Sequence, residues 1–212
     1  MLTPLLGRQR RAVMIDGPGH GPSRPPGALF TGTACARAAA RVLEHLGITD
    51  PVDWVGCAWG GHVGLEIAAD EPHRIRTLTT FRTPFKRCRS PSGYPLLALY
   101  RLAGPVAPIR NALTDTPLGP RAVATQPDLS RRVMAAFSDA DRSAMFTAIR
   151  SAMVRRPTFT RLAAVATPTL MIASRDDPLW TADMAGRRGA DADGRLVIGA
   201  REGSHCTAAD RA

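Results

Sequence analysis

The sequence predicts an α/β protein with a mostly parallel sheet flanked by helices. Short apolar runs of strand length alternate with longer segments whose apolar residues have helical spacing, and this alternation is typical of a parallel sheet covered by helices. The chain has 212 residues, of which 44% are hydrophobic, and this is enough to form the core of one domain. No stretch approaches the roughly 18 uninterrupted apolar residues of a membrane span, so we expect no membrane insertion.

Three strands and two helices are predicted in the first part of the chain. The strands are short apolar runs bounded by turn residues, and they cover residues 11–15, 52–55 and 75–81. The helices have apolar residues at helical spacing and cover residues 31–46 and 61–69. Gly47 follows the first helix and Pro72 follows the second, and both residue types commonly mark helix ends.

The rest of the chain begins with a proline-dotted, mostly helical stretch. It is followed by a strand, a helix and a last strand, at residues 169–173, 180–188 and 196–199. The helical stretch reads as an insertion between two strands, because it has no sheet pattern of its own. We therefore expect a core made of residues 1–83 and 166–212, with residues 84–165 as a helical insertion that lies over it.

A glycine-flanked turn, Gly56–Gly61, lies between a predicted strand and a predicted helix. Glycines on both sides permit a sharp strand-to-helix turn, as in the nucleophile elbow GxSxG. The central residue is Ala58, which has no nucleophilic atom. Cys57 comes one residue early, so we expect its side chain to point away from the site. The alternative is an ordinary tight turn of an α/β protein, with no functional role.

Two polar residues follow later strands in the order that a catalytic triad would need. Asp177 comes after the strand at 169–173, and His205 comes after the strand at 196–199. Asp176 is an alternative acid, because the sequence does not separate two adjacent aspartates. Taken singly, an aspartate after a strand is usually a turn former and a lone histidine is usually a surface residue.

Together, these segments resemble the α/β-hydrolase family, in the branch with a helical cap. The matching segments are VMIDGPGHGPS, WVGCAWGGHVGLEIA, PTLMIASRDDPL and GSHC. The resemblance implies that Asp177 orients His205, that His205 is the general base, and that position 58 is the nucleophile position. It also implies that the backbone N–H of Trp59 is one oxyanion donor.

The resemblance also implies elements that this sequence lacks. Family members have three further strands before the strand at 11–15, a loop that supplies a second oxyanion donor, and a last helix. We therefore expect a chain truncated at the N-terminus and at the C-terminus, with an incomplete sheet. The expected slot lies between the strands at 11–15 and 52–55.

Charge and cysteine content bear on partners and location. The formal net charge is +10, but the 28 basic residues are scattered and no nucleic-acid reading motif is visible, so we expect no nucleic-acid partner. Four cysteines without a CxxC pair, and no secretory leader pattern, favour a cytoplasmic protein with reduced thiols. The histidines are not spaced as ligands, and a loop at residues 17–21 is interrupted by proline, so we expect no metal and no nucleotide cofactor.

Two functions remain open at this point. The resemblance implies a hydrolase of small apolar esters, amides or related substrates, although Ala58 argues against a covalent route. The alternative is a non-catalytic protein that binds a small molecule or a partner on the same scaffold. In both cases the expected partner is a small-molecule substrate or ligand, and the sequence gives no oligomeric state.

Overall fold

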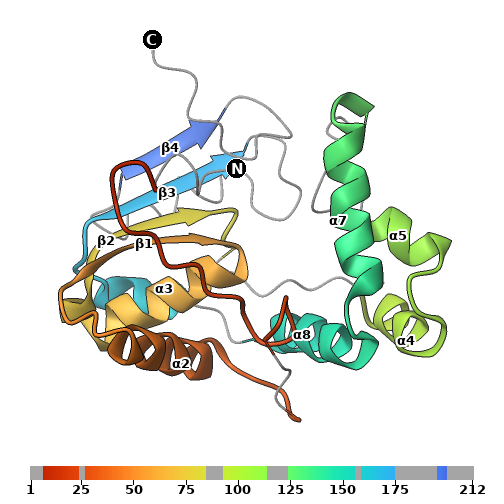
Figure 1. Cartoon of the computed structure of the whole chain (residues 1–212), viewed down its shortest axis with the longest axis horizontal. Helices are drawn as coiled ribbons and strands as arrows, with labels where there is room; N and C mark the ends of the chain where they lie inside the picture. The colour runs from red at the N-terminus through yellow and green to blue at the C-terminus, as the bar shows by residue number, and fades with distance from the viewer. Residues whose placement is uncertain are drawn as a thin grey trace.

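The computed structural model describes residues 7–23, 27–84, 93–113, 124–155, 159–174 and 195–199. In these ranges the chain forms a four-stranded parallel sheet, with two helices on one face and a helical segment to one side (Figure 1). The strands lie in the order β1 (Val52–Cys57), β2 (Ile75–Phe81), β3 (Thr169–Ser174) and β4 (Arg195–Gly199). The predicted parallel sheet flanked by helices is therefore confirmed, and four of the five predicted strands are present within a few residues of their expected bounds.

Strand β2 lies between two partners, and its register aligns their carboxyl ends. Thr80 is opposite Gly56 of β1 on one side and Met171 of β3 on the other. Because the strands are parallel, their carboxyl ends lie along the same edge of the sheet. This edge carries the turn at Ala58, and it is where ligands bind in open α/β sheets.

Two helices, α2 (Gly32–His45) and α3 (Trp59–Asp70), cover one face of the sheet (Figure 1). Thr31 caps α2 by accepting a hydrogen bond from the N–H of Ala34 over 3.1 Å. Gly47 ends the helix with φ +66°, as its place in the sequence predicted. Helix α3 begins two residues earlier than expected, because the turn before it is shorter than the glycines alone indicated.

The main core lies between these helices and the sheet. Leu65 and Ile67 of α3, Leu78 of β2 and Met171 of β3 are each at most 1% exposed. Glu66 of α3 is also buried. Its carboxylate accepts a hydrogen bond from the Thr33 hydroxyl and forms an ion pair with Arg161. Burying a carboxylate is costly unless it is paired, so these contacts stabilise the packing of α2, α3 and the 3-10 turn η3 (Phe159–Ala164).

The predicted strand at residues 11–15 is wrong. These residues form no strand, and their apolar side chains lie in solvent, with Met14 76% exposed. A strand is stabilised by hydrogen bonds to a neighbour, and no described strand pairs with this segment. Within the described ranges β1 is therefore an edge of the sheet, and the predicted slot between two strands is not formed.

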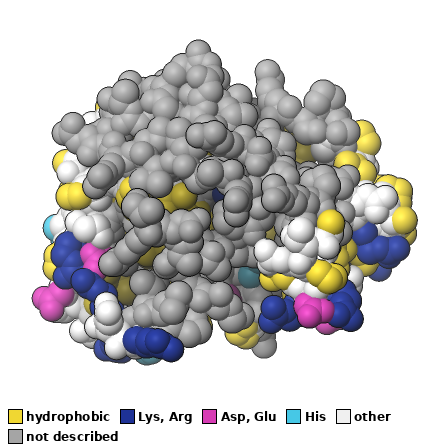
Figure 2. All heavy atoms as spheres, turned by 90° about the horizontal axis from the view of Figure 1, so that it is seen from above, with side chains coloured by type: hydrophobic (Ala, Val, Ile, Leu, Met, Phe, Trp, Pro, Cys, Tyr) yellow, Lys and Arg dark blue, Asp and Glu magenta, His cyan; other side chains and the backbone are white. Residues whose placement is uncertain are grey.

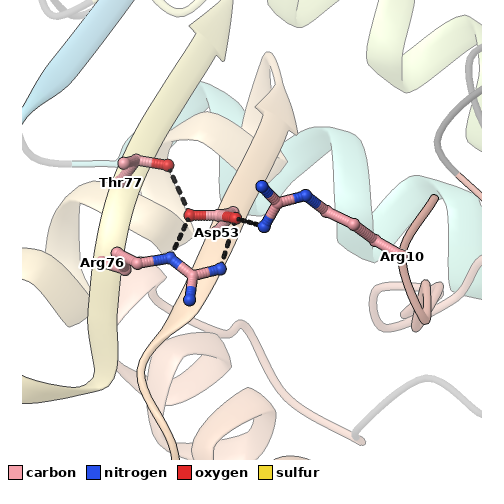
Figure 3. A network of polar contacts seen from close by, with 4 residues as sticks. All are labelled: Arg10, Asp53, Arg76 and Thr77. Atoms are coloured by element: carbon pink, nitrogen blue, oxygen red, sulfur yellow. Dashed lines mark hydrogen bonds and ion pairs between the residues drawn. The ribbon is translucent and has the colours of Figure 1, made fainter.

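An ion pair connects the residues before this segment to β1. Arg10 contacts the carboxylate of Asp53 over 2.7 Å (Figure 3). Asp53 also accepts hydrogen bonds from Arg76 and Thr77 of the neighbouring strand. These bonds, above all those from Arg76, hold the pKa of Asp53 at about 2.

The segment between β2 and β3 is helical, as predicted. It contains α4 (Gly93–Ala103), α5 (Ala107–Leu113), α7 (Pro127–Asp139) and α8 (Arg142–Val154). Tyr100, Ile109 and Phe137 form a second small core there, with the rings of Tyr100 and Phe137 5.1 Å apart. The boundaries 84–165 for a separate insertion stay a prediction.

Among the described helices, none combines the length and the hydropathy needed to cross a membrane.

Candidate active site at the elbow

The turn after β1 has the backbone conformation of a strained elbow. Ala58 has φ 48° and ψ −110°, a region that residues with a side chain rarely adopt. The same residue is the N-cap of α3, and its side chain is exposed at the carboxyl edge of the sheet. A side chain at position 58 is therefore presented to solvent at the point where β1 changes into a helix.

Hydrogen bonds on both sides fix this conformation. The N–H of Ala58 donates to the carbonyl oxygen of Phe81 over 2.8 Å, and the carbonyl oxygen of Ala58 accepts from Gly61 and His62. The indole N–H of Trp54 donates to the carbonyl oxygen of Gly60 over 3.0 Å, so the first turn of α3 is bonded to β1.

The two glycines that flank the turn are required by close contacts. A Cβ on Gly56 would overlap the backbone of Gly60, and a Cβ on Gly61 would overlap the hydroxyl of Thr83. The third glycine, Gly60, has open space around it. The glycine pattern seen in the sequence therefore has a packing reason at positions 56 and 61.

A small cavity of about 180 Å³, which we call the elbow cavity, lies beside the elbow. Its wall includes Trp59 of the elbow, Phe30 and His20, and one face of α8 closes it with Met145, Ala148, Ile149 and Ala152. The Phe30 and Trp59 rings meet edge to face with centroids 5.6 Å apart. The lining is mostly apolar, which suits a small and mostly apolar ligand.

The loop before α2 contacts helix α8 at this side of the cavity. The N–H of Phe30 donates to the buried hydroxyl of Ser151 on α8 over 3.2 Å. Gly19 has φ +78° and lies so close to Ala144 that a Cβ there would be 3.1 Å from its carbonyl oxygen. Helix α8 therefore sits directly against the loop at residues 17–20, and the two together bound one side of the cavity.

His62, one turn into α3, is 3% exposed. Burial, with a smaller contribution from Arg155, lowers its pKa to about 3. The imidazole is therefore neutral at pH 7, and its position inside the helix suits packing rather than proton transfer.

The structure places some of the predicted site residues and not others. Ala58 and Trp59 lie together at the elbow, and the exposed side chain of Cys57 belongs to the edge strand β1. Asp177, the alternative Asp176 and His205 lie outside the described residues. Phe30, His20 and the face of α8 line the cavity but were not among the predicted site residues. The glycine-rich loop around His20 could have indicated a site. The sequence of α8 indicated only a helix that packs against its neighbours.

Within the described ranges, no three histidine, cysteine, aspartate or glutamate side chains gather as a metal site would require.

The sequence model of the α/β hydrolase fold family matches residues 2–116, which is just over half of the chain. This match includes the elbow and the strands on either side of it. The chain belongs to the α/β hydrolase fold family.

Solved structures of hydrolases share this fold. A hydrolase from Pseudomonas aeruginosa PA01 is 23% identical, with a TM-score of 0.80 over 92% of this chain and 73% of that one. An enol-lactonase from Burkholderia xenovorans LB400 is 17% identical, with a TM-score of 0.80 over 89% and 72%. A thermophilic esterase from Thermogutta terrifontis is 20% identical, with a TM-score of 0.75 over 85% and 68%. Among curated protein sequences, none matches this chain.

Proposed function

We propose that this α/β hydrolase fold protein binds a small, mostly apolar ester or lactone in the elbow cavity without cleaving it through a covalent intermediate. The observation that carries the proposal is the methyl group of Ala58, which occupies the exposed position of a fully formed elbow. Loss of the nucleophile leaves only the modest catalysis that an oxyanion hole and binding supply.

The cavity limits the size of the ligand. Its volume of about 180 Å³ is below the roughly 300–1,000 Å³ of pockets for drug-sized molecules. A short acyl chain fits this volume better than a long one. The rings of Phe30 and Trp59 would pack on the acyl chain, and His20 adds a polar side chain to the cavity wall.

The second candidate is hydrolysis, and the preserved elbow favours it. Trp59 is the first residue of α3, and the N–H groups of the first helical turn have no partner within the helix. In this candidate the Trp59 N–H stabilises the oxyanion, His205 is the general base and Asp177 orients it. Because Ala58 supplies no nucleophile, water is the nucleophile in this candidate. His205 takes the proton of the water as its oxygen adds to the ester carbonyl carbon, and this proton goes to the leaving alcohol as the acyl–oxygen bond breaks.

The test is to place a hydroxyl at the elbow. We expect the parent to bind p-nitrophenyl butyrate without releasing nitrophenol above background, and Ala58→Ser to release it measurably. Cys57→Ser is the matched control, because it adds a hydroxyl one residue early and should stay inactive. His205→Ala in the Ala58→Ser background should remove the gained activity but not ligand binding. A parent as active as Ala58→Ser would overturn the non-catalytic proposal.

A further inference from the structure

A second, larger cavity lies between α4 and α8. Its volume is about 370 Å³, within the range of small-molecule pockets. Helix α4 lines it with one stripe of side chains at helical spacing: Tyr94, Leu97, Ala98, Arg101 and Leu102. Helix α8 contributes Phe146 and Arg150, which are four residues apart on one face. We call this cavity the α4–α8 groove.

The α4–α8 groove is separate from the elbow cavity. Helix α8 faces the elbow with Met145 and Ile149, and it faces the groove with Phe146 and Arg150. Adjacent residues of a helix point about 100° apart, so the two cavities lie against different faces of the same helix. Among the described residues, none lines both of them.

Two arginines flank an otherwise apolar lining. The guanidinium carbon of Arg101 is 5.9 Å from the centre of the Phe146 ring, which places this charge over the groove wall. Among the described residues, no carboxylate pairs with Arg101 or Arg150. Both side chains are exposed and available to an anion.

The groove also leaves large apolar groups in water. Leu102 is 81% exposed and Tyr94 is 53% exposed. At the right of Figure 2, hydrophobic side chains lie beside basic and acidic ones. Covering such surface is favourable by about 25 cal/mol for each Å² removed from water.

We propose that the α4–α8 groove binds a medium-chain alkanoate, with its alkyl chain along Leu97, Ala98 and Phe146 and its carboxylate between Arg101 and Arg150. The guanidinium group matches a carboxylate through two parallel hydrogen bonds, which makes Arg a suitable partner for this headgroup. A single anionic head and a single alkyl chain fit a groove that places two arginines, neither paired with a described carboxylate, beside an apolar wall. The binding site does not depend on the chemistry at the elbow.

The experiment is calorimetric titration of the whole chain with octanoate, octan-1-ol and acetate. Octanoate should bind, whereas octanol and acetate should each bind at least about tenfold more weakly, because one lacks the charge and the other lacks the chain. The double variant Arg101→Gln with Arg150→Gln should weaken octanoate at least about tenfold. The matched control is Arg41→Gln, which removes an exposed arginine of α2 and should change nothing.

A second pair of variants locates the site. Ala98 is exposed on α4, and Ala98→Leu fills the groove without disturbing the helix, so octanoate binding should be lost. The same change at the exposed Ala38 of α2 controls for the added side chain. Ala152→Leu, which fills the elbow cavity instead, should leave octanoate binding intact. A thermal melt of each variant checks the fold. Equal binding of octanol and octanoate by the parent, or unchanged binding by a folded Ala98→Leu protein, would overturn the proposal.

Discussion

The backbone N–H of Ala58 donates to the carbonyl oxygen of Phe81, so the residue in the strained turn is bonded to the last residue of the neighbouring strand. This bond joins the turn after β1 to the end of β2 at the carboxyl edge of the sheet. The positive φ of 48° is therefore imposed by the surrounding backbone. It is strained because the Cβ of alanine disfavours this conformation.

Replacing Ala58 with glycine should stabilise the protein. Glycine adopts positive φ without the penalty that a Cβ causes, so we expect the free energy of unfolding to rise by about 1 kcal/mol. Chemical denaturation measures the change. The same substitution at Ala38, in the middle of α2, should lower the free energy of unfolding by about 1 kcal/mol. Equal signs for the two variants would mean that the turn is not strained.

Gly56→Ala should be strongly destabilising, because the new methyl group would overlap the backbone of Gly60. We expect a loss of about 2–3 kcal/mol, as for overpacking in a rigid site. Gly60→Ala is the control. Position 60 is helical and open, so this variant should be neutral or more stable by up to about 1 kcal/mol. Urea denaturation measures both variants. If Gly56→Ala and Gly60→Ala shifted the urea midpoint by the same amount, the close contact between position 56 and the backbone of Gly60 would be contradicted.

The buried His62 should make the stability depend on pH. Its pKa is about 3 in the folded protein, below the ordinary value of 6.5, so the unfolded chain binds a proton that the folded protein does not. The free energy of unfolding should therefore fall as pH drops below about 6.5, by up to about 1.4 kcal/mol per pH unit. Thermal melts between pH 7 and pH 5 measure the slope. His62→Leu should flatten it, whereas His45→Gln, at an exposed position, should not.

Asp53 should contribute to acid sensitivity at lower pH. Because its pKa is lowered to about 2 by the Arg76 hydrogen bond, its contribution is present above about pH 4 and is lost as pH falls from about 4 to 2. The partners are partly exposed, so we expect no more than about 1 kcal/mol. Asp53→Asn should lose this amount at pH 6 and little at pH 2. Asp139→Asn, at an exposed helix end, is the control and should change neither value.

The sequence predicted the elements whose local signals agreed with their surroundings. The helix that Thr31 caps and Gly47 ends was found within a residue of its bounds, and the strand at 75–81 was found at its bounds. The segment at residues 11–15 had the apolar pattern of a strand, but pattern alone does not supply the neighbour that a strand needs.

The candidate site was predictable only in part. Gly56 and Ala58 were identified because the turn depends on residues next to each other in the chain. Phe30 and Ser151 are 121 residues apart, and their hydrogen bond brings α8 against the elbow cavity. No local pattern indicates a contact between segments so far apart.

The hydrogen bonds and glycine contacts around position 58 fix the elbow even though the side chain of Ala58 is only a methyl group. The geometry of the turn is thus independent of the reactive group that it usually presents. Serine, cysteine or another small residue can replace Ala58 while the backbone of the turn stays the same. The protein therefore offers a reference scaffold on which the contribution of the nucleophile can be measured separately from that of the fold.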